Sequence, residues 1–156
     1  MLRAALLARR SGVTVDGTVR VGRGVRVEVA PGARLWLGDG CVLGAGSRVL
    51  VRGGSVRIGA GTRLDDGCRV VAHTGVTIGS RCVLGPQVAV IDAEPEIGQV
   101  EVPLRLQGLA ASPVVIGDGV LVGPGAVVLA GARVADGLVL GARTVTGPAV
   151  ADSAAP

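Results

Sequence analysis

A six-residue repeat of aliphatic residues, many of them followed by glycine, runs through most of this chain. The repeat is regular at Leu37-Gly38, Leu43-Gly44 and Val49, and its longest run extends from Ile116-Gly117 to Thr146. A helix repeats every 3.6 residues and a half-buried strand every two, so neither element alone produces this pattern. A short strand followed by a tight turn, repeated every six residues, does produce it.

Three such units close a triangular coil of about 18 residues, and successive coils stack as parallel strands about 4.8 Å apart. The sequence therefore predicts an all-β domain over residues 13–150, built as a triangular prism of about six coils. Residues 1–12 are expected to cap one end of the prism, with leucines on a short helix. The Ala- and Pro-rich tail, residues 151–156, is expected to close the other end.

The interior of such a prism must be narrow, and the composition agrees. The chain has 156 residues, of which 49% are apolar, but it has no Phe, no Tyr and a single tryptophan, Trp36. Val, Leu, Ile and Ala must therefore fill the core, and Trp36, between inward-facing leucines, should point outward. Cys41, Cys68 and Cys82 fall on a second, inward repeat four residues after the first. We expect them to be small core residues rather than nucleophiles or disulfides.

The charge and the N-terminus narrow the functional classes. The net charge is +4, carried by 16 arginines. No nucleic-acid partner is expected, because the arginines lack aromatic neighbours on which bases stack. The uncharged run Gly119 to Ala132 falls short of the ~20 apolar residues that a membrane span needs. The N-terminal segment is a poor signal peptide, and an odd number of cysteines fits a compartment in which thiols stay reduced. We therefore expect a cytoplasmic protein without a membrane span.

The repeat fails at one place, between Val90 and Ile116. Glu94 there occupies a phase at which a small inward residue should lie, and an unpaired carboxylate is costly to bury among aliphatic side chains. The chain is therefore expected to leave the prism near Asp92 and to return near Pro113, as one extruded loop over residues 92–113. Long loops in compact repeat proteins are often functional.

The C-terminal coils carry a family resemblance. The stretch PVVIGDGVLVGPGAVVLAGARVADGLVLGARTVTGP, Pro113 to Pro148, resembles the hexapeptide-repeat acyltransferases, and the resemblance extends over most of residues 13–150. It implies a left-handed parallel β-helix that works as a homotrimer, with its sites between subunits. It also implies acyl-CoA, or an acyl carrier thioester, as the co-substrate, with no tightly bound cofactor.

The family's catalytic base is a histidine that follows a stretch like Val88–Asp92 within a few residues. This chain has Ala93, Glu94, Pro95 and Glu96 at those positions, and its only histidine is His73. His73 is expected at the same corner of the prism, one coil lower. We therefore predict His73 as a displaced general base, with the carboxylates of Asp92, Glu94 and Glu96 as candidate partners. A surface histidine at a turn is the open alternative.

The thioester donor implied by the resemblance lies against the last coils. Four small residues there leave room for a pantetheine arm, and Arg143 offers a positive charge to a phosphate. The small residues are Gly123, Gly125, Ala126 and Ala142. A tight coil requires small residues in any case, so the structural explanation stays open beside the functional one.

Outward-facing arginines mark the lower coils of the predicted prism. They form a solvated face or attract an acidic partner such as an acyl carrier protein. They are Arg20, Arg23, Arg26, Arg48, Arg52, Arg57, Arg63, Arg69 and Arg81.

The favoured function is transfer of an acyl group, acetyl above all, from a CoA-type thioester to a hydroxyl or amine of a small molecule or sugar. A catalytically degenerate scaffold or binding subunit is the alternative, because the family's histidine is absent. A zinc hydratase on this type of coil, like the gamma-class carbonic anhydrases, requires three histidine ligands and the chain has one. We therefore expect no metal site.

Overall fold

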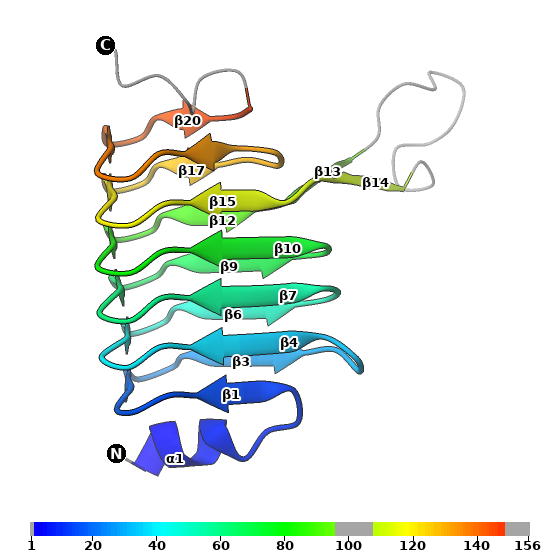
Figure 1. Cartoon of the computed structure of the whole chain (residues 1–156), viewed down its shortest axis with the longest axis vertical. Coiled ribbons are helices and arrows are strands. Elements are labelled where there is room, and N and C mark those ends of the chain that lie inside the picture. The colour runs from blue at the N-terminus through cyan, green and yellow to red at the C-terminus, as the bar shows by residue number, and fades with distance from the viewer. Residues whose placement is uncertain (1, 96–107, 149–156) are drawn as a thin grey trace.

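The chain winds into six triangular coils stacked along one axis, in a computed structural model that describes residues 2–95 and 108–148 (Figure 1). Each coil contributes one strand to each of three six-stranded parallel sheets, which we call sheets A, B and C. The predicted all-β fold, a left-handed parallel β-helix of about six coils, is confirmed.

The sheets take every third strand of the prism. Sheet A contains β1 (Val13–Val15), β4 (Arg34–Leu37), β7 (Ser55–Ile58), β10 (Gly75–Ile78), β15 (Val114–Ile116) and β18 (Arg133–Val134). Sheet B contains β2 (Arg20–Val21), β5 (Val42–Leu43), β8 (Arg63–Leu64), β11 (Val83–Leu84), β16 (Leu121–Val122) and β19 (Val139–Leu140). Sheet C contains β3 (Arg26–Val29), β6 (Arg48–Val51), β9 (Arg69–Ala72), β12 (Ala89–Ile91), β17 (Val127–Val128) and β20 (Val145–Thr146).

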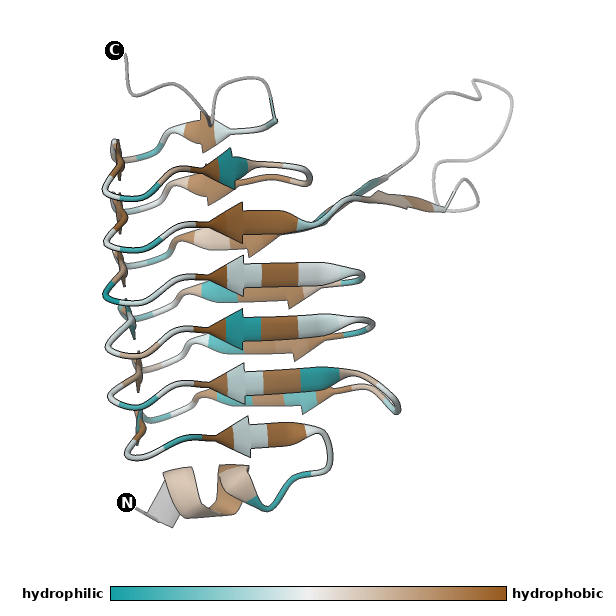
Figure 2. Cartoon of the chain, in the orientation of Figure 1, coloured by the Kyte–Doolittle hydropathy of each residue, from teal (hydrophilic) through white to brown (hydrophobic). Residues whose placement is uncertain are grey.

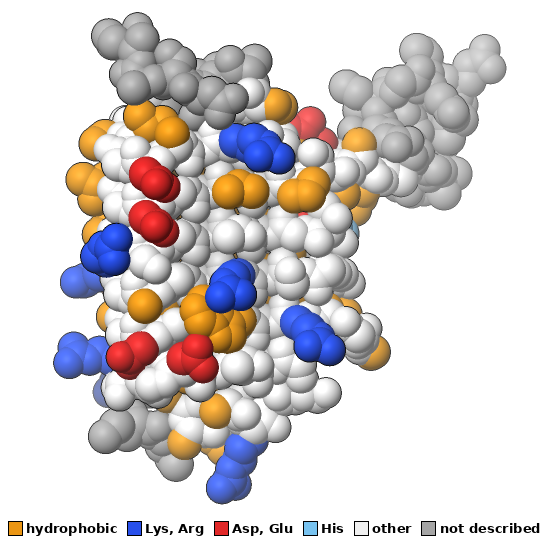
Figure 3. Space-filling view, viewed as in Figure 1, with side chains coloured by type: hydrophobic (Ala, Val, Ile, Leu, Met, Phe, Trp, Pro, Cys, Tyr) orange, Lys and Arg blue, Asp and Glu red, His pale blue; other side chains and the backbone are white. Residues whose placement is uncertain are grey.

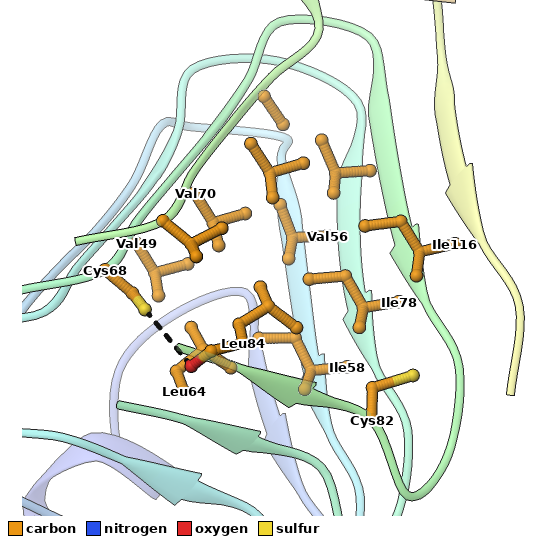
Figure 4. Packing of buried hydrophobic residues seen from close by; sticks show 14 of the residues in the cluster. Val49, Val56, Ile58, Leu64, Cys68, Val70, Ile78, Cys82, Leu84 and Ile116 are labelled. Carbon is orange, nitrogen blue, oxygen red and sulfur yellow. Dashed lines mark hydrogen bonds between the residues drawn. The ribbon is translucent and has the colours of Figure 1, made fainter. Parts of the chain in front are cut away.

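The repeating aliphatic residues stack in register inside the prism. In sheet A, Leu37 is the Cα partner of Ile58, and Ile58 is the partner of Ile78. These side chains are at most 1% exposed. In β7 and β10 the buried apolar residues alternate with more exposed, less hydrophobic ones (Figure 2). The three sheets meet in one narrow aliphatic core (Figure 4). Each fully buried side chain of this size stabilises the fold by about 1.5–3 kcal/mol.

The three cysteines point into the prism, as predicted, and are 0% exposed. Each thiol donates to a glycine carbonyl of the next coil, with Cys68 Sγ 3.1 Å from the oxygen of Gly85. Cys68 also lies beside the carbonyl of Leu84 (Figure 4). Burial raises the pKa of the Cys68 thiol to about 11, so the thiol stays protonated at neutral pH. A buried neutral thiol is a poor nucleophile.

The N-terminal helix α1 (Leu2–Ala8) covers the first coil and packs against β1 and β2. Leu7 is buried against the prism, whereas Leu6 is 57% exposed. A helix of two turns presents only one face to the coil, so not all of its leucines act as a cap. The tail, residues 149–156, lies outside the described residues.

Trp36 points outward from sheet A, as predicted. Its indole Nε1 donates to Asp16 Oδ2 at 2.9 Å, and the guanidinium of Arg57 lies 4.0 Å from the ring centroid. These contacts fix the position of the ring through cation–π attraction and one hydrogen bond.

The chain leaves the coil after β12 and rejoins it at β15 (Figure 1). In between, β13 (Ala93–Pro95) pairs antiparallel with β14 (Leu109–Ala111) and forms a two-stranded ribbon that projects from the prism. Among the described residues the ribbon consists of Ala93–Pro95 and Leu109–Ala111, which lie within the predicted loop of residues 92–113.

Glycines at the corners allow one coil to lie on the next. A Cβ added to Gly59 would lie 2.5 Å from the backbone carbon of Gly79, so Gly59→Ala must push two coils apart. We expect this variant to lower the free energy of unfolding by about 3 kcal/mol, measured by chemical denaturation. Gly147 has no atom of residues 2–95 or 108–148 within 4 Å of the same position and is the matched control, with Gly147→Ala within about 0.5 kcal/mol of the parent. Equal effects of the two substitutions would contradict the account of coil spacing.

Candidate functional site

The edge between sheets C and A, which we call the CA edge, has irregular turns. Its turns follow β3, β6, β9, β12 and β17, and the turn after β12 is replaced by the projecting ribbon. Arg52 follows β6 and His73 follows β9, and the backbone N–H of Arg52 donates to Ala72. Because the turns at this edge differ in length, they do not stack as regularly as the strands do. Polar side chains such as those of Arg52 and His73 are accommodated in them.

Asp92 is the most deeply buried charged group in the described part of the chain, at 0% exposed. It follows Ile91, whose Cα partner is Val71, so it stacks above Ala72 at a position that faces the core. Its carboxylate accepts three backbone N–H groups, from His73 at 2.7 Å, Thr74 at 2.8 Å and Gly75 at 2.7 Å. Hydrogen bonds to a charged acceptor are about twice as strong as neutral ones, so these bonds compensate for the burial of the charge.

His73 lies directly against this carboxylate. Its imidazole Nδ1 is 3.6 Å from Asp92 Oδ1, the oxygen that already accepts the His73 backbone N–H. That distance is too long for a hydrogen bond, and Nδ1 is the one buried side-chain nitrogen or oxygen without a hydrogen-bond partner among residues 2–95 and 108–148. The side chain is 26% exposed. Because Nδ1 is buried, the exposed surface belongs to the other atoms of the side chain.

Glu94 does not make the contact that the sequence suggested for it. It is exposed on the ribbon, where its Cα partner is Ala110, and its carboxylate forms no ion pair with His73 within the described ranges. The buried carboxylate of this corner belongs to Asp92 instead. It can be buried because the turn of the coil below offers it three backbone N–H groups. Glu96, the other predicted partner, lies outside the described residues.

The small residues predicted to receive the donor lie on the edge between sheets B and C, which we call the BC edge. Gly123 and Gly125 are half-buried, and Ala142 and Arg143 are exposed. Ala126 is only 1% exposed. Its methyl group packs in the core, and its role in a donor groove stays a prediction.

The fold itself explains the glycines of the BC edge. A Cβ on Gly123 would lie 2.5 Å from the backbone nitrogen of Ala142, and Gly125 has a φ of +70°. Arg143 occupies the equivalent position one coil higher with a φ of +60°, a conformation that costs a non-glycine residue about 1–2 kcal/mol. The strained backbone turns the Arg143 side chain out over this edge, and its Cγ would lie 3.4 Å from a Cβ on Gly125.

One chain does not bring the two predicted halves of the site together. His73 and Asp92 lie at the CA edge, and the residues of the donor region lie at the BC edge. The strands of sheet C separate the two edges. A complete site therefore requires a second copy of the chain or a donor long enough to cross the sheet.

Neither a metal centre nor a membrane span is found in the described part of the chain. Residues 2–95 and 108–148 contain no group of three or more His, Cys, Asp or Glu side chains able to hold a metal ion. In the same ranges, no helix has the length and apolar character needed to cross a membrane.

Comparison with known sequences gives one informative relative. No family model matches the chain. A Mycobacterium tuberculosis protein named "probable acetyltransferase" is 27% identical over 141 residues, which cover 90% of this chain. The match covers 47% of that protein, so the chain spans about half the length of its relative.

Solved structures give the fold. A variant of AntD, an N-acyltransferase of Bacillus cereus in complex with dTDP and coenzyme A, matches with a TM-score of 0.76 at 13% identity. The match covers 92% of this chain and 76% of that one. A hexapeptide-repeat acetyltransferase of Vibrio cholerae, complexed with acetyl coenzyme A, matches with a TM-score of 0.63 at 20% identity, over 92% of this chain and 64% of that one. This chain has the fold of these proteins, a left-handed parallel β-helix.

The family resemblance predicted from residues 113–148 is thereby confirmed. At such identities the structural likeness establishes the fold of this chain and leaves its substrates open. The only histidine of the chain, His73, lies one coil below the position at which the resemblance implies a catalytic base.

Asp92 provides a stability test of this corner. Asp92→Ala would leave three backbone N–H groups without an acceptor, and we expect the free energy of unfolding to fall by about 3 kcal/mol. Chemical denaturation measures the change. The control is Asp65→Ala, which removes a surface carboxylate that pairs with Arg63 at 2.7 Å, and it should cost less than about 1 kcal/mol. A similar loss in both variants would contradict the anchoring role of Asp92.

Proposed function

We propose that this protein is an acyltransferase, with His73 as the general base and Asp92 as the residue that positions it. The observation that carries the proposal is the His73 imidazole, held with Nδ1 against a buried carboxylate and with part of the side chain open to solvent. A carboxylate accepts hydrogen bonds and cannot donate them when ionised, so it favours a proton on Nδ1. The lone pair of Nε2 is then free to accept a proton.

The chemical step follows from this arrangement. Nε2 of His73 takes the proton from an acceptor O–H or N–H as the acceptor atom attacks the thioester carbonyl carbon. The C–S bond breaks, the sulfur leaves as a thiolate, and the imidazolium returns the proton to the thiolate. Proton transfer by a positioned base accelerates such a step by about 10²–10⁴.

The donor in this proposal is acyl-CoA, with acetyl as the acyl group, bound along the BC edge of a neighbouring subunit. The acetyltransferase name of the sequence relative and the coenzyme A in structures of the same fold support this choice over an inert scaffold. Gly123, Gly125 and Ala142 would leave room for pantetheine, and Arg143 would face a phosphate. An acyl carrier protein is the alternative source of the thioester. The acceptor is a small molecule with a hydroxyl or amine, such as a sugar, in the cytoplasm.

A homotrimer would join the two edges, and an exposed apolar column supports it. Val83, Leu121 and Val139 are Cα partners on the outer face of sheet B and are 36%, 47% and 68% exposed. Hydrophobic side chains gather at the left edge of the molecule in the coils toward the C-terminus, above the arginines of the lower coils (Figure 3). Exposed apolar patches of this kind mark contact surfaces between proteins.

His73→Ala tests the base. We expect kcat/KM for acetyl transfer to fall by about 10²–10⁴. Release of free coenzyme A over a panel of sugar and amine acceptors, followed with a thiol reagent, measures the rate. The three buried thiols of the protein give little background in this assay, because burial raises the pKa of each.

Glu94→Gln is the matched control, because it removes an exposed carboxylate from the same corner without touching His73. It should change the rate by no more than about twofold. An active parent with an unaffected His73→Ala variant would exclude His73 as the base. A parent that neither binds nor consumes any acyl thioester would favour the scaffold instead.

A further inference from the structure

Three arginines form a column on the outer face of sheet C. Arg26 is the Cα partner of Arg48, and Arg48 is the partner of Arg69. All three side chains are exposed, and none of them forms an ion pair within residues 2–95 and 108–148. We call these residues the arginine ladder. Their backbones are about 4.8 Å apart along the prism axis, the spacing of adjacent strands.

The ladder is not a consequence of the high arginine content alone. In sheet B the equivalent column reads Arg20, Val42, Arg63 and Val83, so arginines there are separated by valine. The paired strands of sheet A likewise place no arginine beside another among the described residues. Sheet C therefore places arginines next to one another, whereas sheets A and B keep their arginines apart.

Such a column costs stability in the isolated chain. Like charges directly opposite on neighbouring strands repel, and 4.8 Å lies well inside the Debye length of about 8 Å at physiological salt. Two carboxylates lie nearby and reduce the repulsion only in part: Glu28 on the strand of Arg26, and Asp66 at the preceding corner, where Oδ1 accepts the backbone N–H of Ala45. A feature that lowers stability without a structural benefit, such as this column of like charges, is expected at a binding site.

We propose that the arginine ladder binds a linear anionic polysaccharide that lies along the prism axis. One acidic group on each sugar gives the polymer charges at regular intervals along its length, which suits side chains held in register on parallel strands. Each guanidinium offers a planar pair of N–H donors to a carboxylate or sulfate. Acyl transfer from acyl-CoA uses none of these arginines, so this proposal and the proposed function can fail separately.

Other polyanions fit this face less well. The described outward residues of sheet C include no aromatic side chain on which a nucleic-acid base could stack. A folded acidic protein needs an exposed apolar anchor for stable docking, and the described large exposed apolar side chains of sheets B and C lie in the upper coils, at Val83, Leu121, Val139 and Val145.

Arg48→Gln tests the ladder at its centre, and Arg133→Gln is the matched control with the same loss of charge on sheet A. Calorimetric titration with size-fractionated oligogalacturonate should show binding that weakens between about 50 mM and 200 mM salt. Arg48→Gln should lower the affinity about fivefold, whereas Arg133→Gln should leave it unchanged. Without ligand, Arg48→Gln should keep or raise the melting temperature, because it relieves repulsion.

Five results would overturn the proposal. The first four are no binding of oligogalacturonate at low salt, an equal loss of affinity in both variants, a lower melting temperature of ligand-free Arg48→Gln, and tighter binding of oligothymidylate or polyglutamate than of oligogalacturonate. The last result would assign the surface to a nucleic acid or an acidic protein. Competition by galacturonate monomer at the same sugar concentration would also contradict recognition of a polymer.

Discussion

The close approach of one coil to the next is the constraint on which this structure depends. Parallel strands of adjacent coils are hydrogen-bonded along all three sheets, so the corners must stack as tightly as the strands. That spacing excludes a Cβ at corner positions such as Gly59 and leaves room inside only for aliphatic and small side chains. It also places outward residues of neighbouring coils side by side, whatever their charge. The core, the glycine-rich corners and the arginine ladder all follow from it.

The candidate site lies where this constraint is relaxed. At the CA edge the turns differ in length, and after β12 the chain leaves the prism altogether. The carboxylate of Asp92 then reaches an inward position and holds the turn His73–Gly75 through three backbone N–H groups. Because this one carboxylate both closes the turn and faces the imidazole, the geometry of His73 depends on the same contacts that stabilise the corner.

Much of the fold is visible in the sequence, because each six-residue unit repeats the same physical requirement. Leu37 and Ile58 are recognisable as core residues, the cysteines as inward small residues, and Val90 as the last residue before the interruption. The role of Asp92 is not visible in this way, because its partners are backbone N–H groups, which no residue identity reveals. The ladder is hidden for a different reason. The three arginines of the ladder align only because the turns at the CA edge make the lower coils longer than three six-residue units.

The tautomer of His73 tests the central claim most directly. His73 is the only histidine of the chain, so a sample labelled with nitrogen-15 gives one pair of imidazole nitrogen signals. In the neutral ring, the account predicts a proton on Nδ1, toward Asp92, and a bare Nε2. It also predicts that the ratio of the Nδ1–H and Nε2–H forms changes in folded Asp92→Asn, because the asparagine amide can donate hydrogen bonds as well as accept them. A proton held on Nε2 in the parent protein would contradict the account, because that nitrogen could not then take a proton from an acceptor.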